Sequence, residues 1–241
     1  MIRVYITYYD KGSEEHGKTS GLEHRLGRNL LCRGLRELYG LNVSAETGSV
    51  DSFLEKEKNG KPYIKDRPDI HFNISHCSGM VVCAFADQPV GVDAETVRPV
   101  RDPLIRRVLH EQEIQTLSRY GEIAEKGRSV SGPKEKDPRS QEFLRLFFRY
   151  WTLKESWLKQ DGSGLTREPR EICFFVDPDD WTSPVHASEH GRLCLQRVFD
   201  RRQEDQKEYI VSVCLSCAPE SPDAGIGSDI VWIYDTFHKN V

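Results

Sequence analysis

The chain has 241 residues, of which 37% are hydrophobic, and a formal net charge of −4, so it can bury one large core or two modest ones. The small net charge does not indicate binding to nucleic acid or to an anionic membrane. No apolar run approaches the roughly 20 residues of a membrane span. Seven cysteines at irregular spacing, with no signal peptide in the first residues, predict reduced thiols in a cytoplasm.

The first half of the chain predicts a strand, a helix and three further strands. An apolar run predicts a strand at residues 2–8. Leucines at helical spacing predict a helix over residues 22–39, namely Leu22, Leu26, Leu30, Leu35 and Leu38. Three more strands are expected around residues 70–75, 80–86 and 90–95, and Arg98-Pro99 then marks a break.

The second half predicts a similar order of elements. A helix is expected near residues 110–120 and a long helix over about 141–160, with strands near residues 172–176, 193–199 and 208–215. Residues 121–141 contain almost no apolar side chains, which predicts a mobile loop. Residues 219–228 have the composition of a linker, whereas residues 230–234 are apolar enough to dock as a strand. Helix followed by sheet thus occurs twice, which favours an α+β fold.

Two acidic residues close the strand at residues 90–95. In a strand, Asp93 and Glu95 project from the same face roughly 6 to 7 Å apart, so they can converge on one hard cation. Val92 and Ala94 would then point into a core. A solvated strand edge is the alternative for an isolated pair of this kind. The pair stands where an apolar pattern stops, and binding sites gather at such edges.

A third acid lies in the aromatic and basic run of residues 151–159. If this run is helical, Glu155 and Lys159 are i,i+4 neighbours on one face, which puts an acid beside a base. An ordinary surface ion pair has the same spacing. The combination of the three carboxylates predicts a magnesium site for phosphoryl chemistry.

Other chemistries find little support in the sequence. There is no Gly-x-Ser-x-Gly nucleophile motif, no dinucleotide fingerprint and no phosphate-binding loop, since Gly60-Lys61 is followed by a proline. Cys214 and Cys217 have half of a zinc spacing without a second pair nearby, so alternating burial at a strand end explains them better.

Several blocks of sequence, in their order and spacing, resemble the 4'-phosphopantetheinyl transferases, specifically the longer pseudo-dimeric type that serves nonribosomal peptide and polyketide synthetases. The blocks are residues 23–25, 59–62 and 72–76 and the two acidic runs. Asp-x-Glu followed by Trp-x-x-Lys-Glu-Ser-x-x-Lys is highly specific. The resemblance covers about residues 22–176. It implies a pseudo-two-fold tandem of two similar α+β halves, residues 1–97 and 98–218, with a tail over residues 219–241 and the active site in the cleft between the halves.

The resemblance also implies roles for individual residues. Asp93, Glu95 and Glu155 match positions that hold Mg2+, and Glu155 is also a candidate base. Lys159 and Lys154 are expected to add positive charge beside the transferring phosphate. Coenzyme A is expected to bind residues of the earlier blocks, namely Arg25, Asn59, Gly60, Lys61, Pro62, Ser75 and His76. Without the family pattern, Arg25 would be a solvated helix residue, Lys61 a turn lysine and His76 a structural histidine.

The implied reaction moves 4'-phosphopantetheine from coenzyme A to a serine hydroxyl of an apo acyl or peptidyl carrier protein and releases adenosine 3',5'-bisphosphate. The expected protein is a cytoplasmic monomer that binds neither nucleic acid nor membrane. Two alternatives stay open: a catalytically weak coenzyme A-binding or carrier-binding module of the same fold, and a magnesium-dependent phosphodiesterase acting on a phosphopantetheinyl substrate.

Three further expectations concern the surroundings of the site. Residues 10–21 are shorter than the corresponding family segment, so Lys11 and Lys18 are expected to replace some of its basic residues. Glu113 aligns loosely with another family acid but is interpreted as part of a solvated helix face. A docking patch for an acidic carrier helix is expected over residues 101–109, where Arg106 lies among apolar side chains. An ordinary amphipathic helix start is the alternative for this segment.

Overall fold

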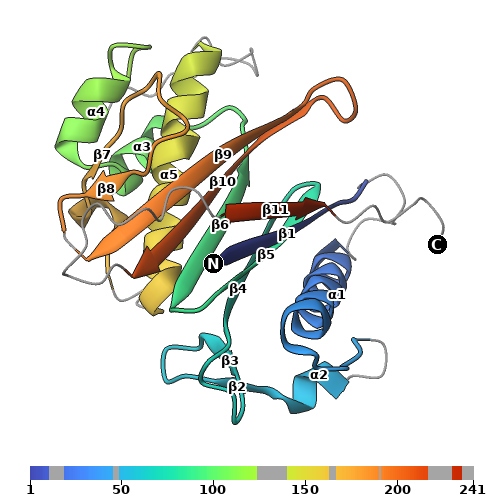
Figure 1. The fold of residues 1–241 in the computed structure, drawn as a ribbon. Helices are drawn as coiled ribbons and strands as arrows, with labels where there is room; N and C mark the ends of the chain where they lie inside the picture. Colours follow the sequence, from blue (N-terminus) through green and yellow to red (C-terminus); the bar gives the residue numbers. More distant parts are fainter. Residues whose placement is uncertain are drawn as a thin grey trace.

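The computed structural model describes residues 1–10, 19–45, 49–123, 140–162, 167–189, 191–216 and 230–234. They form an α+β fold in which two main sheets pack face to face between helices (Figure 1). Lys11, Lys18, most of the predicted loop 121–141 and all of the predicted linker 219–228 lie outside the described residues. In the described part of the chain, no helix is both long and apolar enough to cross a membrane.

The first sheet consists of β1 (Ile2–Tyr8), β4 (His71–Cys77), β5 (Met80–Ala86) and β11 (Ile230–Tyr234), in the order β11-β1-β5-β4. Helix α1 (Thr19–Tyr39) covers its outer face. Every residue of β5 is buried, because alternate side chains pack against α1 on one face and against the second sheet on the other. Burial on both faces explains why β5 is a continuous apolar run rather than an alternating one.

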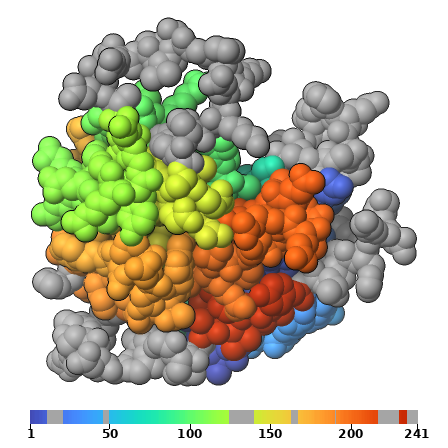
Figure 2. Space-filling model, turned by 90° about the horizontal axis from the view of Figure 1, so that it is seen from above, coloured from blue at the N-terminus to red at the C-terminus, as the bar shows by residue number. Residues whose placement is uncertain are grey.

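The second sheet consists of β6 (Val90–Thr96), β9 (Arg192–Arg201) and β10 (Lys207–Ser216), in the order β6-β10-β9. One face shares a core with the first sheet, and the other packs against α5 (Gln141–Asp161). The short helices α3 (Asp102–Val108) and α4 (Glu111–Leu117) lie beside α5. Figure 2 shows these green and yellow helices and the orange strands filling one side of the molecule.

The remaining elements are short. Helix α2 (Ser49–Ser52) leads into the hairpin of β2 (Leu54–Lys56) and β3 (Pro62–Ile64). The 3-10 helix η3 (Pro169–Glu171) precedes β7 (Phe174–Phe175), which pairs with β8 (His186–Ala187). In Figure 1 the β2-β3 hairpin projects from the lower end of the molecule.

The predicted elements are present, with two differences in pairing and length. The apolar segment 230–234 docks as predicted, because β11 pairs in parallel with β1. Strand β6 belongs to the first half by sequence but pairs with β10, so it joins the sheet of the second half. The strand expected at residues 172–176 is only the two-residue β7. The two-fold relation between the halves stays a prediction.

The predicted docking patch over residues 101–109 is wrong as an apolar surface. Ile105, Val108 and Leu109 are 0%, 6% and 2% exposed and belong to the core beneath α5. Their apolar side chains are therefore not available to a partner, because packing α3 against the long helix already buries them.

Candidate active site

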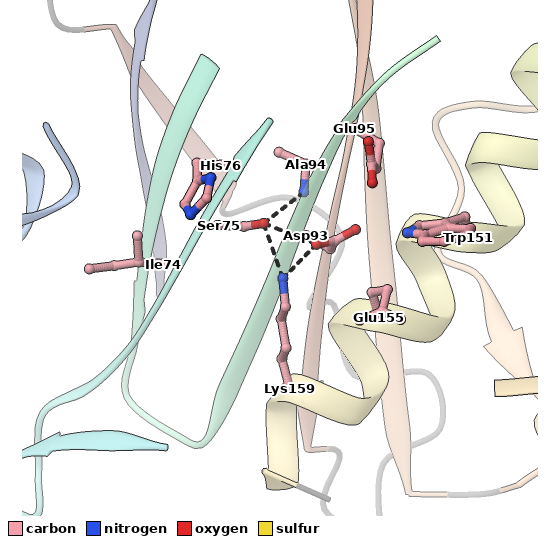
Figure 3. A pocket seen from close by; sticks show the side chains of 9 residues that line it. All are labelled: Ile74, Ser75, His76, Asp93, Ala94, Glu95, Trp151, Glu155 and Lys159. Carbon is pink, nitrogen blue, oxygen red and sulfur yellow. Dashed lines mark hydrogen bonds and ion pairs between the residues drawn. The ribbon is translucent and has the colours of Figure 1, made fainter. Parts of the chain in front are cut away.

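One cavity of about 330 Å³ lies where β4, β6 and α5 meet (Figure 3). Its walls are Ile74, Ser75 and His76 from β4, Asp93, Ala94 and Glu95 from β6, and Trp151, Glu155 and Lys159 from α5. The structure therefore brings together the three predicted metal ligands, the predicted catalytic Lys159 and two of the predicted coenzyme A ligands.

Side-chain hydrogen bonds join β4 to β6 beside the cavity. The Val92 N–H donates to Asn73 Oδ1 at 2.9 Å, and the Ala94 N–H donates to Ser75 Oγ at 3.3 Å. The other edge of β6 pairs with β10. The side chains of Asn73 and Ser75 therefore accept from backbone N–H groups of β6 that would otherwise need a neighbouring strand. Val92 and Ala94 are buried as predicted. Asp93, which lies between them in the strand, faces the cavity.

Gly91 permits a close approach of β6 to α5. A Cβ atom at this position would overlap the backbone carbonyl of Ser156 and the backbone amide of Gln160. Backbone atoms of a packed helix cannot move aside as the end of a side chain can, so only glycine fits here. This approach lets the acids of β6 and α5 face one cavity.

Helix α5 presents three cavity residues along one face. Trp151, Glu155 and Lys159 are spaced i, i+4 and i+8, so each lies about one turn from the next. The helix starts where Ser140 Oγ accepts from the Phe143 N–H at 3.1 Å, as expected for a serine N-cap. Trp151 was not predicted as a site residue, although the spacing that pairs Glu155 with Lys159 also includes it.

Asp93 is the centre of the hydrogen bonds in the cavity. Its Oδ1 accepts from Lys159 Nζ at 2.6 Å and from Ser75 Oγ at 2.9 Å, and Lys159 Nζ also donates to Ser75 Oγ at 3.1 Å. Its Oδ2 is buried and, within the described part of the chain, has no hydrogen-bond partner. A buried carboxylate oxygen without a partner is unfavourable, so Oδ2 marks a place for a bound cation or donor.

The other two carboxylates have raised pKa values. Burial raises the pKa of Glu155, and the nearby charge of Asp93 raises it further. Burial also raises the pKa of Glu95, although the Arg98 guanidinium, 2.6 Å from Glu95 Oε2, opposes this shift. Acids that share one cavity disfavour each other's ionised form, and a bound cation relieves that repulsion.

The chemistry of these acids fits a magnesium ion, since carboxylate oxygens are ligands that Mg2+ prefers. Mg2+ is usually held by one or two carboxylates, with water and substrate phosphate oxygens as the other ligands. Among the described residues, no three Asp, Glu, His or Cys side chains are gathered closely enough to form an ion site by themselves. Asp93 Oδ2 has no partner among the described residues, and Glu155 and Glu95 line the same cavity. This arrangement resembles an open metal site, which takes part of its ligands from other molecules, rather than a site formed by protein ligands alone.

His76 lies at the rim of the cavity with 52% of its side chain exposed. Its Nδ1 is 3.2 Å from Oε2 of Glu23 on α1, and Tyr9 OH also donates to Glu23. The sequence predicts no individual role for Glu23 or Tyr9. Glu23 belongs to the 23–25 block of the family resemblance, which marks its position but not its partner. Its contact with His76 and the place of Tyr9 arise only from the packing of α1 against the first sheet.

Lys154, which was predicted to act beside the phosphate, does not line the cavity. Its buried Nζ pairs with Glu113 Oε2 at 2.7 Å and donates to the carbonyls of Pro169 and Ile172. The interpretation of Glu113 as solvated is wrong, because it is 1% exposed and also accepts from the Phe174 N–H. Burial raises the pKa of Glu113 and lowers the pKa of Lys154. The pair ties α4 to α5.

The 59–62 block contacts the end of α5 rather than the cavity. Asn59 Nδ2 donates to the Asp161 carbonyl at 3.3 Å. Lys61 Nζ donates to the carbonyls of Val90, at 3.2 Å, and of Gln160. Such donors satisfy the free carbonyls at a helix C-terminus, so the hairpin is held against α5.

The other predicted coenzyme A ligands also lie outside the cavity walls. Gly60 has a φ of 90°, the left-handed conformation that its tight turn between β2 and β3 requires. Pro62 begins β3, and Arg25 is exposed on α1. Coenzyme A binding by these residues stays a prediction.

Comparison with known proteins gives one family. A sequence profile of the 4'-phosphopantetheinyl transferase superfamily matches residues 89–214, which include both acidic runs. The chain is 36% identical over 173 residues to the 4'-phosphopantetheinyl transferase Sfp of Bacillus subtilis (strain 168), and this match covers 72% of the chain and 66% of that protein.

Two other relatives carry the same name. The chain is 30% identical over 198 residues to the 4'-phosphopantetheinyl transferase ffp of Bacillus subtilis, covering 82% of the chain and 75% of that protein. It is 32% identical over 160 residues to the 4'-phosphopantetheinyl transferase HetI of Nostoc sp. (strain PCC 7120 / SAG 25.82 / UTEX 2576), covering 63% and 59%. The chain therefore belongs to the 4'-phosphopantetheinyl transferase superfamily, a family of transferase enzymes.

Proposed function

We propose that this protein transfers 4'-phosphopantetheine from coenzyme A to a serine hydroxyl of an apo acyl or peptidyl carrier protein, in a reaction that needs Mg2+. The observation that carries the proposal is the meeting of Asp93, Glu95, Glu155 and Lys159 in one cavity. We also propose that this cavity is the cleft between two related halves and that the protein acts as a cytoplasmic monomer.

The reaction forms a bond from the serine oxygen to the β-phosphorus of coenzyme A and breaks the bond from that phosphorus to the bridging oxygen. Adenosine 3',5'-bisphosphate leaves with the charge that develops on the bridge. Fixed positive charge beside that oxygen lowers the barrier. Lys159 provides it, because Asp93 and Ser75 hold its Nζ in the cavity. Bound by Asp93, Glu95 and Glu155, Mg2+ would supply further positive charge to the pyrophosphate.

Glu155 is the proposed acceptor of the serine proton. Burial and the charge of Asp93 raise its pKa in the metal-free cavity, and we propose Glu155 both as a metal ligand and as the base. A general base is most effective when its pKa approaches the working pH. The proton thus moves from the serine hydroxyl to Glu155 as the new bond forms.

Coenzyme A is proposed to bind through the phosphate ligands Arg25, Lys61 and His76 and through a rim formed by Ser75 and residues 59–62. The positions of Ser75 and His76 in the cavity wall support this part of the proposal. Lys61 is already engaged with two carbonyls at the end of α5, so its contact with a phosphate would require the side chain to turn.

Intact-protein mass spectrometry tests the proposed transfer. An apo carrier protein incubated with this protein, coenzyme A and Mg2+ is expected to gain the mass of one phosphopantetheine group, and Glu155→Gln should abolish the gain. Glu142→Gln removes an exposed carboxylate from the first turn of the same helix and should preserve it. Coenzyme A binding without a mass gain on several carrier types would contradict the proposal and favour a binding module. Release of phosphopantetheine from a loaded carrier would instead favour a phosphodiesterase.

A further inference from the structure

Glu23 projects from α1 and is bound on two sides. Its Oε2 lies 3.2 Å from Nδ1 of His76, and its Oε1 accepts a hydrogen bond from Tyr9 OH. The Glu23 side chain is only 12% exposed. An acid with this burial and two specific partners does not behave as part of a solvated helix face.

Tyr9 connects Glu23 to the strands of the first sheet. Its hydroxyl also lies 3.1 Å from the Cys77 carbonyl at the end of β4, and its N–H donates to the Gly79 carbonyl at 3.0 Å. Burial and the hydrogen bond to Glu23 raise the pKa of Tyr9, so the hydroxyl stays a neutral donor. The carboxylate is thereby tied to the strand that carries His76.

The contact with Glu23 determines which ring nitrogen of His76 can bind a ligand in the cavity. An imidazole whose Nδ1–H is bound to a carboxylate has only Nε2 left for another partner. The charged groups that share the cavity with His76 are Lys159 and the acids Asp93, Glu95 and Glu155. A ligand that enters the cavity would therefore meet the Lys159 ammonium and the Nε2 side of the His76 ring.

We propose that Glu23, braced by Tyr9, is a positioning residue that holds the His76 ring with Nε2 available to a phosphate oxygen of coenzyme A. This inference rests on the proposed function, because it takes coenzyme A as the ligand of the cavity. Glu23 does not touch the substrate and acts only through His76.

A double-mutant cycle on coenzyme A binding tests the inference, with calorimetry on the full chain in the presence of Mg2+. Glu23→Gln is expected to weaken binding about tenfold, because one charge-assisted hydrogen bond is lost. His76→Gln should weaken binding at least as much. In the His76→Gln background, Glu23→Gln should have no further effect, whereas independent, additive losses would overturn the role of Glu23.

Matched variants separate positioning from folding. Glu37→Gln removes a carboxylate from the same helix that also accepts from a tyrosine, Tyr5 OH at 3.0 Å, and should leave binding unchanged. Tyr9→Phe should weaken binding by a smaller factor than Glu23→Gln, and Glu23→Asp, which keeps the charge, should recover part of the loss. Full binding by Tyr9→Phe and by Glu23→Gln together would overturn the inference.

Nitrogen-15 NMR of His76 gives a readout that a structural role would not move. On addition of coenzyme A, the Nε2 resonance of His76 should shift in the wild-type protein and should shift less in Glu23→Gln. In steady state, Glu23→Gln should raise KM for coenzyme A and leave KM for the carrier unchanged. If the wild-type protein binds no coenzyme A, the proposed function fails. If it binds and Glu23→Gln binds equally, only the role of Glu23 fails.

Discussion

Asp93 uses its two carboxylate oxygens differently. Oδ1 binds Lys159 and Ser75, whereas Oδ2 is buried and has no partner in the described part of the chain. Glu95 and Glu155 stand in the same cavity with pKa values raised first by burial. Metal ligands must be deprotonated to bind, so proton release from these acids and cation binding are coupled.

Mg2+ should therefore stabilise the protein more at high pH than at low pH. Because the folded pKa values of Glu95 and Glu155 lie above the ordinary value of 4.5, their stabilising contribution is present below that value and lost as the pH rises through the folded values. Mg2+ binding should restore it. We expect the rise in Tm on adding Mg2+ to be larger at about pH 8 than at about pH 5, and to shrink in Glu155→Gln. An equal rise at both pH values would count against the metal site.

The buried pair of Glu113 and Lys154 should be structural. Glu113→Ala leaves the Lys154 ammonium without its 2.7 Å partner, and losing one member of a buried pair costs about 3–5 kcal/mol of stability. The double variant Glu113→Leu with Lys154→Met should recover most of that loss, as measured by urea unfolding. It should also keep the transferase activity. A double variant that folds well but transfers nothing would restore a catalytic role for Lys154.

At the scale of elements, the contact between β6 and α5 decides whether the acids can act together. The strand supplies Asp93 and Glu95, and the helix supplies Glu155 and Lys159. Gly91 lies where the two backbones meet. The hairpin of β2 and β3 supports the same contact, because Lys61 binds the ends of both elements.

Gly91→Ala should therefore damage both stability and activity. The added methyl group overlaps the α5 backbone, and overpacking of this kind costs about 1–3 kcal/mol. Since the helix must shift away from β6, activity of the folded fraction should fall as well. Gly21→Ala adds the same group at a helical position with nothing within 4 Å and is the control for urea unfolding and transfer assays. Similar behaviour of the two variants would show that the backbone contact is unimportant.

At the scale of the whole molecule, β11 links the two sheets. It pairs with β1 at the edge of the first sheet. Its Trp232 packs edge-to-face on Phe199 of β9, with ring centroids 5.4 Å apart. The strand thus covers an edge that would otherwise expose unpaired backbone groups, and it adds apolar contact to the second sheet.

Trp232→Ala should destabilise the protein by about 1–3 kcal/mol, because an aromatic contact and its buried area are lost. Val231 is the neighbour on the same strand and is 43% exposed. Val231→Ala should therefore change stability by less than about 0.5 kcal/mol. Urea unfolding of both variants measures the difference. Equal losses would mean that β11 contributes pairing but no specific packing.

Residue patterns predict the elements of this fold because periodicity is a local property. The leucine stripe predicts α1, and the unbroken apolar run predicts β5. The spacing of Asp93 with Glu95, and of Glu155 with Lys159, correctly puts each pair toward one cavity. Lys154, Glu113 and the apolar side chains of α3 were misread, because charge and spacing alone do not show which residues a neighbouring element will bury.

Local sequence patterns predict the α+β class, the order of most elements and the acids that line the cavity, since these depend on side-chain periodicity and on the chemistry of single residues. Three-dimensional packing was needed to show that β6 pairs with β10, that Lys159 binds Asp93, that Lys61 caps α5 and that Glu23 contacts His76. Each of these contacts joins residues far apart in the chain. Such contacts form only when the elements pack together, so they depend on burial and hydrogen bonding over the whole molecule.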